Sequence, residues 1–167
     1  MKHLSKGKMV TACVGLCTLF MAGAASAEYR VTAFGQSAGF KAILAGDIDS
    51  ASAVLGRRDL SELDFVEANN LCVTQILSKH YEAAVATCSI ALDEVESDLS
   101  IGVMTERTAK ASIISNLAVA LAQTGDFTAA GAALEKALSL NSLDRNALVN
   151  YDLVSARIPD TELVQGL

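Results

Sequence analysis

Histidine, cysteine and clustered acidic side chains are the groups in this 167-residue chain that could do chemistry, and they are few. A nucleophile and a base must lie within hydrogen-bond reach of each other. His80 is the one histidine after residue 27, and it falls in a predicted turn, eight residues from both Cys72 and Cys88. We therefore expect His80 to be solvated and the protein not to be an enzyme.

A run of acidic residues near the middle of the chain could bind a cation. A calcium loop, however, needs alternating oxygen ligands around a central glycine, and that pattern is absent, as is a glycine-rich phosphate loop. The run predicts a solvated helix end, so neither a metal nor a cofactor is expected. Its members are Asp93, Glu94, Glu96 and Asp98.

The first 27 residues have the three parts of a secretory signal peptide. Three lysines precede an apolar stretch from Met9 to Ala22, and Ala25-Ser26-Ala27 forms a small-x-small cleavage site. A membrane anchor is the alternative, but the apolar stretch is short for a span. The pattern predicts cleavage after Ala27 and a periplasmic or secreted mature protein.

Removal of residues 1–27 takes three of the 13 Lys and Arg residues and none of the 19 Asp and Glu residues. The formal net charge then changes from −6 to −9. This balance argues against nucleic acid as a partner and against acidic lipid surfaces, and we expect no stable membrane anchor after cleavage. Cys72 and Cys88 are the cysteines that remain, in an oxidising compartment.

Residues 111–144 have the periodicity of a helical hairpin. Apolar residues recur at helical spacing on both sides of Gly125-Asp126, a helix stop followed by a helix start. Ala118, Ala130 and Ala137 fall where two antiparallel helices would cross, and small side chains there let the helix axes approach closely.

This segment resembles a tetratricopeptide repeat, a helix-turn-helix unit of 34 residues. Residues 65–98 fit the same register, with Asn70-Leu71-Cys72 in place of Asn116-Leu117-Ala118 and Lys79-His80 in place of the Gly-Asp turn. Asn150 lies 34 residues after Asn116. The matching residues in 111–144 are Asn116, Leu117, Ala118, Leu121, Gly125, Asp126, Phe127, Ala130, Leu134, Ala137 and Ser142.

The resemblance implies an all-α, right-handed superhelix of about three hairpins and a closing helix within residues 28–158. The units are expected at 32–64, where the pattern is degenerate, at 65–98 and at 111–144, with the closing helix at 145–158. An insertion near 99–110 predicts a loop and a helix that starts near Met104 or Thr105, and 159–167 is expected to be a tail. A generic helical bundle is the alternative.

In this register Cys72 and Cys88 lie on the inner faces of two antiparallel helices, almost symmetrically about Lys79-His80. The resemblance therefore implies a disulfide that staples the hairpin. Two buried free thiols are the alternative, and a redox role is disfavoured because buried thiols lack the exposed, low-pKa character it needs.

The resemblance also implies a concave groove lined by the first helix of each hairpin. The groove is apolar with a few amides, which suits an amphipathic helix or an extended peptide. Alternatively, these residues are core, or the segment 28–32 covers them. The expected groove residues are Phe40, Ile43, Asn69, Val73, Ile76, Leu77, Ser115, Val119, Gln123 and Val149.

These observations predict an exported, non-enzymatic scaffold that binds another protein or peptide, and export suggests envelope assembly by analogy with other proteins of this fold. A self-associating structural protein, in which the groove closes a homo-oligomer, is the second hypothesis. A metal- or redox-active accessory protein is the third.

Overall fold

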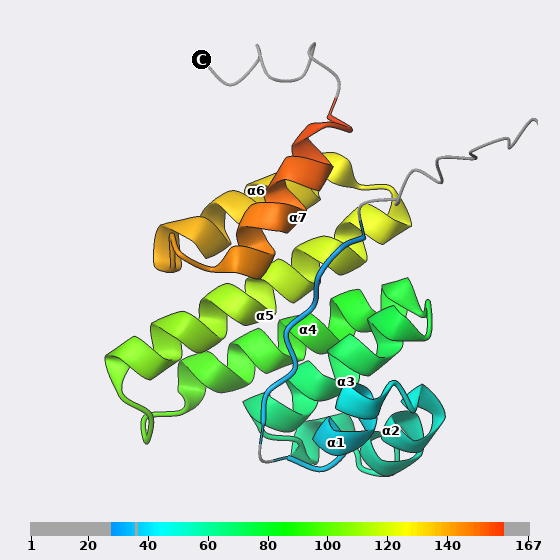
Figure 1. Ribbon diagram of the computed structural model, residues 1–167. Helices are drawn as coiled ribbons and strands as arrows, with labels where there is room; N and C mark the ends of the chain where they lie inside the picture. Colours follow the sequence, from blue (N-terminus) through cyan, green and yellow to red (C-terminus); the bar gives the residue numbers. More distant parts are fainter. Residues whose placement is uncertain (1–27, 36, 159–167) are drawn as a thin grey trace, which may run out of the picture.

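The computed structural model describes residues 28–35 and 37–158. Within these ranges the chain forms seven α-helices and one 3₁₀-helix and contains no β-strand (Figure 1). The expected all-α class is therefore confirmed. The predicted leader, 1–27, and the predicted tail, 159–167, lie outside the described residues.

The helices follow one another along the chain. They are α1 (Phe40–Ala45), α2 (Ile48–Leu55), η1 (Leu60–Glu62), α3 (Phe65–Leu77), α4 (Tyr81–Ser97), α5 (Val103–Thr124), α6 (Phe127–Leu140) and α7 (Arg145–Ser155). Each α-helix packs against the next α-helix in sequence. In addition, α3 contacts α5 and α5 contacts α7, so these three helices form one row (Figure 1).

Aspartate side chains define the starts of four helices. Each accepts a hydrogen bond from a backbone N–H two or three residues further on, which satisfies a donor that the helix leaves open. These caps are Asp47 of α2, Asp64 of α3, Asp126 of α6 and Asp144 of α7.

The turn between the helices of each long hairpin requires a left-handed residue. Gly125 supplies it between α5 and α6, with φ 96°. Lys79 supplies it between α3 and α4, with φ 63°, and is the one non-glycine residue with positive φ among the described residues. Lys79 thus takes the conformation that glycine takes in the other hairpin.

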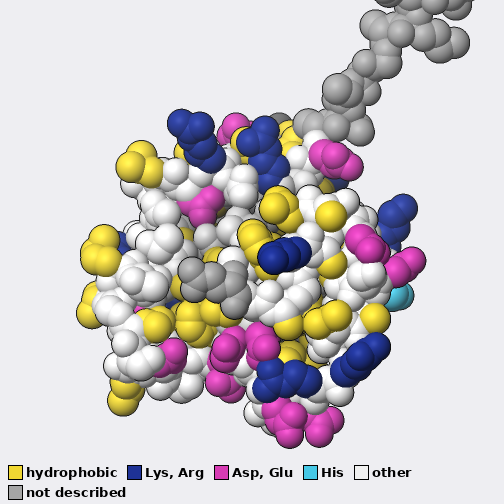
Figure 2. All heavy atoms as spheres, turned by 60° about the horizontal axis from the view of Figure 1, so that its bottom comes forward, with side chains coloured by type: hydrophobic (Ala, Val, Ile, Leu, Met, Phe, Trp, Pro, Cys, Tyr) yellow, Lys and Arg dark blue, Asp and Glu magenta, His cyan; other side chains and the backbone are white. Residues whose placement is uncertain are grey.

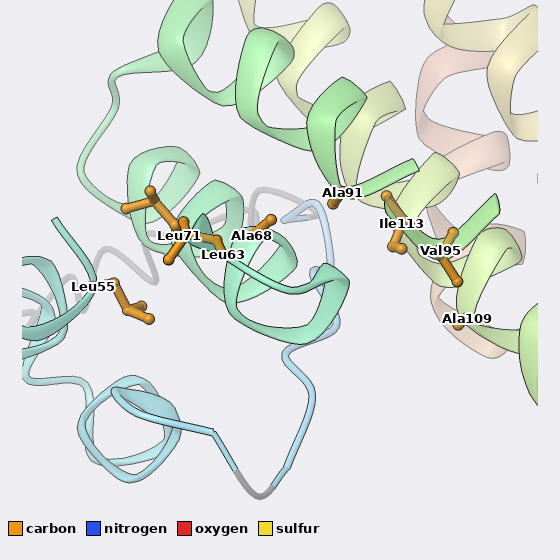
Figure 3. Packing of buried hydrophobic residues seen from close by; sticks show 8 residues of the cluster. All are labelled: Leu55, Leu63, Ala68, Leu71, Ala91, Val95, Ala109 and Ile113. Atoms are coloured by element: carbon orange, nitrogen blue, oxygen red, sulfur yellow. The ribbon is translucent and has the colours of Figure 1, made fainter. Parts of the chain in front are cut away.

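Small side chains let the helices approach closely. Ala118, Ala130 and Ala137, which were expected at a helix crossing, are all fully buried. At the other end of the molecule, branched side chains from α2, α3, α4, α5 and the residue after η1 join alanines of α3, α4 and α5 in one cluster (Figure 3). The cluster consists of Leu55, Leu63, Ala68, Leu71, Ala91, Val95, Ala109 and Ile113. The short α2 therefore shares a core with the longer helices.

The degenerate unit expected at 32–64 has only part of a hairpin. α1 is six residues long and is followed by the Gly46-Asp47 turn and α2. The described residues before Phe40, 28–35 and 37–39, form no helix, and 28–34 run as an extended segment along the row of α3, α5 and α7 (Figure 1). α5 begins at Val103, and α7 covers Arg145–Ser155.

Candidate peptide-binding groove

Three asparagine side chains hold the backbone of the extended segment. Each side-chain oxygen accepts a hydrogen bond from a backbone N–H of the segment, and each amide nitrogen donates to the carbonyl oxygen of the same residue. The pairs are Asn150 with Arg30, Asn116 with Thr32 and Asn70 with Phe34, and the N···O distances are 2.7–2.9 Å. We call these three asparagines the asparagine ladder.

The ladder works because the geometry of the segment matches the spacing of the helices. In an extended chain the backbone groups of alternate residues point to the same side. Residues 30, 32 and 34 therefore all present N–H and C=O to the row of helices. The three asparagines come from α7, α5 and α3, one from each helix.

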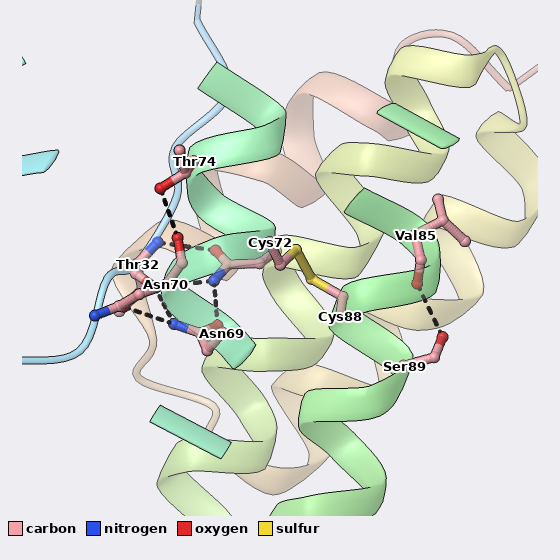
Figure 4. The surroundings of a disulfide bond; sticks show 9 residues. Thr32, Asn69, Asn70, Cys72, Thr74, Val85, Cys88 and Ser89 are labelled. Atoms are coloured by element: carbon pink, nitrogen blue, oxygen red, sulfur yellow. Dashed lines mark hydrogen bonds between the residues drawn. A yellow bond between two sulfur atoms is a disulfide. The ribbon is translucent and has the colours of Figure 1, made fainter. Parts of the chain in front are cut away.

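A second set of hydrogen bonds fixes the ladder from within the protein. The Asn116 amide nitrogen donates to Asn69 Oδ1 at 2.8 Å, and Asn150 donates to Ser115 Oγ at 3.2 Å. Asn69 also donates to the Thr32 carbonyl oxygen at 2.9 Å (Figure 4). All four asparagines are fully buried. Such burial is costly without partners, and the network provides them.

Side chains of the segment contact all three core clusters of the protein. Phe34 packs edge-on against Phe65, with ring centroids 6.2 Å apart. Val31 packs on the cluster that contains the disulfide. Tyr29 contacts two clusters and accepts a hydrogen bond from Arg157, whose guanidinium lies 5.6 Å from the tyrosine ring centroid.

Expected groove residues line two of the clefts that border the segment. The first has a volume of about 460 Å³, and its lining includes Val31 and Ala33 of the segment. The second, of about 300 Å³, also borders Val31. The expected groove residues Phe40, Ile43, Val73 and Leu77 line the first cleft, and Ile76, Leu77, Val119 and Gln123 line the second.

The other expected groove residues have different places. Asn69 binds the segment and Ser115 supports Asn150. Val149 is half-buried on α7 and lines neither cleft. The segment itself covers this face, as one alternative from the sequence had it, although it extends beyond Thr32 to Phe34.

The ladder is not among the features predicted from the sequence, although the sequence contains a signal for it. Asn70, Asn116 and Asn150 hold the same position in successive units of the repeat register. An amide repeated at one register position could have been interpreted as a row of hydrogen-bonding groups. What the row binds could not be inferred from spacing alone.

The disulfide between Cys72 and Cys88 lies directly beside the ladder. It joins α3 to α4, with the two Cα atoms 5.3 Å apart, and both residues are fully buried (Figure 4). Cys72 lies two residues after Asn70 on α3. The disulfide therefore fixes α3, which carries Asn70 of the ladder, to α4.

The remaining chemical candidates form none of the ladder's hydrogen bonds. His80 is exposed at the start of α4. In the acidic run, Lys110 lies 2.9 Å from Glu96, and this hydrogen bond lowers the pKa of Glu96 and raises the pKa of Lys110. Hydrogen bonds from Ser100 lower the pKa of Asp98. Within the described ranges, no three His, Cys, Asp or Glu side chains are grouped so that they could hold a metal ion.

Comparisons of the chain with protein-family models, with curated proteins and with solved structures find no match. None of the described helices is both long and apolar enough to cross a membrane. The case for a function therefore depends on the geometry of the groove.

Proposed function

We propose that this protein is an exported, non-enzymatic scaffold of tetratricopeptide type that binds an extended segment of another protein along α3, α5 and α7. The observation that carries the proposal is the asparagine ladder. Its six hydrogen bonds go to backbone atoms, which every non-proline sequence supplies. The site is thus chemically suited to polypeptide.

The repeat architecture of the proposal has two supports. The asparagines of the ladder occupy equivalent positions of the repeat register, and consecutive helices pack in chain order. Stacked helical hairpins of this kind produce extended concave surfaces for binding. A right-handed superhelix of about three units is the arrangement we propose.

Export is supported by the leader pattern and by the disulfide. Disulfides persist in oxidising compartments such as the periplasm, and Cys72 and Cys88 are paired. We place the protein in the periplasm or outside the cell, and its partner among exported proteins, with envelope assembly as the setting.

Site-specific photocrosslinking in exporting cells tests this function. A photoreactive residue at Gln123, which is exposed at the second cleft, should form adducts with another polypeptide. The matched position is Lys136, exposed on α6 and outside both clefts. Adducts at Gln123 and none at Lys136 support the proposal, whereas equal labelling or no adduct at Gln123 contradicts it.

Self-association is the second candidate, and exposed apolar side chains at the α4–α5 connection favour it. Leu99, Val103 and Met104 are 95%, 69% and 72% exposed, and Met104 also lines a cleft of about 490 Å³. Figure 2 shows apolar side chains spread among acidic and basic ones on the face turned forward. Light scattering on the purified protein measures its molar mass and distinguishes the two functions. A dimer favours self-association, and a monomer favours the scaffold.

A further inference from the structure

We infer that residues 28–35 are an internal ligand that occupies the groove in place of an extended partner segment, and that a segment with larger apolar side chains at the positions of Val31 and Ala33 displaces it. The inference rests on the proposed function and deepens it, because it states what the partner must carry. Its three supports are the order of the site, the space left beside the occupant and the partial enclosure of the occupant.

The ladder is ordered by hydrogen bonds that do not involve the occupant. Asn116 is bonded to Asn69, and Asn150 is bonded to Ser115. These bonds keep the amides oriented when the segment leaves, while water satisfies the groups that it uncovers. A site organised before binding loses less conformational entropy when a partner enters.

The occupant leaves space beside it. Val31 and Ala33 both line the cleft of about 460 Å³, whose walls include Phe40, Ile43 and Leu77. A Leu at either position extends further into this apolar space. Each buried methylene group favours binding, so such a segment binds more tightly than the chain's own.

The occupant is also only partly enclosed. None of residues 28–35 is fully buried, and Arg30 is exposed although its backbone is bonded to Asn150. Residues 28–35 belong to no helix, and α1 begins at Phe40. The segment can therefore leave the groove without unwinding a helix.

Labelled synthetic peptides and the full mature, disulfide-bonded chain test the inference by fluorescence anisotropy. One peptide has the sequence of residues 28–35, and a second carries Val31→Leu and Ala33→Leu. We expect the second to bind the chain about tenfold more tightly or better. Equal affinities, or tighter binding of the unchanged sequence, would overturn the inference.

N-methylation of the second peptide distinguishes ladder binding from adhesion to an apolar surface. Methyl groups on the backbone nitrogens of positions 30, 32 and 34 remove the three N–H groups that the peptide donates to the ladder. Binding of the peptide should then weaken about 30-fold or more. Methyl groups at positions 31 and 33 are the matched control, since these N–H groups have no partner among the described residues. Equal losses from both patterns contradict the inference.

Loosening the internal ligand should open the site. Phe34→Ala in the full chain removes the contact with Phe65, so the second peptide should bind this variant about tenfold more tightly than the unchanged chain. If Phe34→Ala folds poorly, Thr32→Pro is the second variant. It loosens the segment by removing the backbone N–H that Thr32 donates to Asn116. Absence of peptide binding to a folded, loosened chain refutes the inference.

The two proposals fail separately. If the peptide binds but no crosslinks form at Gln123 in cells, the internal-ligand inference stands and the proposed function is wrong. If crosslinks form at Gln123 but the peptide does not bind to the ladder, the protein is still a binding scaffold and the internal-ligand inference is wrong.

Discussion

Asn116 links the occupant to Asn69 on the neighbouring helix of the row. Its side chain pairs with both backbone groups of Thr32 and also donates to Asn69 on α3. No other chemical group of this size provides an acceptor and two donors in one plane. The residue is therefore specified by its hydrogen bonds more than by its volume.

Asn116→Asp should destabilise the protein by about 3 kcal/mol at neutral pH, because it removes both donors and buries a charge. Chemical denaturation measures this loss. Asn141→Asp is the control, since the Asn141 oxygen that accepts from Leu143 is retained, and we expect a change within about 0.5 kcal/mol. Similar losses in both variants would show that the ladder has no special role.

Lys79 shows the cost of a side chain at a left-handed position. Lys79→Gly should stabilise the protein by about 1 kcal/mol, because φ 63° is strained for lysine and open to glycine. Lys136→Gly, inside α6, should lose about 1 kcal/mol. The two variants are compared by thermal unfolding, and a loss at Lys79 would contradict the account of this turn.

At the scale of elements, the two long hairpins solve the same packing problem differently. Cys72 and Cys88 occupy the register positions of Ala118 and Leu134, and all four residues are fully buried. The α5–α6 pair is held by apolar contact alone at this point. The α3–α4 pair has a covalent bond there.

Cys72→Ala combined with Cys88→Leu copies the sister hairpin and isolates the effect of the crosslink. We expect the protein to keep its helical content but to lose about 3 kcal/mol, the stabilisation that closing a loop of this length gives. Circular dichroism with denaturant measures both quantities. If the variant matches the oxidised protein in stability, packing rather than loop closure accounts for the pair.

The paired helices were the elements most accessible from the sequence. Asp126, Gly125 and the buried alanines predicted the α5–α6 hairpin, and the register then located α3, α4 and the cysteine pair. A segment at 28–32 that covers the groove is one alternative that the sequence offers, but the asparagines that bind its backbone could not be predicted, because they lie 36 to 120 positions further along the chain. Local periodicity carries no information on such contacts.

At the scale of the whole molecule, the segment connects three helices that are not consecutive in the sequence. It contacts α3, α5 and α7 and all three core clusters, whereas the α-helices pack mainly on their neighbours in sequence. It thus adds long-range connections to an architecture that is otherwise built step by step.

Hydrogen exchange should distinguish the segment from the helices. The amides of Arg30, Thr32 and Phe34 should exchange through local opening, faster than amides in the middle of α5. Denaturant should change their rates little, since opening exposes little surface. Identical protection and denaturant dependence in the segment and α5 would mean that the segment leaves only when the whole protein unfolds.

The three asparagines of the ladder bind every second residue of the segment, at positions 30, 32 and 34. A shift of the segment by two positions would offer the asparagines an equivalent set of backbone groups, whereas a shift by one would present the wrong edge. Side-chain contacts distinguish one even step from the next, among them Phe34 against Phe65, the bond of Thr32 to Asn146 and the bond of Tyr29 to Arg157. The groove therefore restricts a bound segment to alignments that differ by two residues, and the side chains of the segment select one of them.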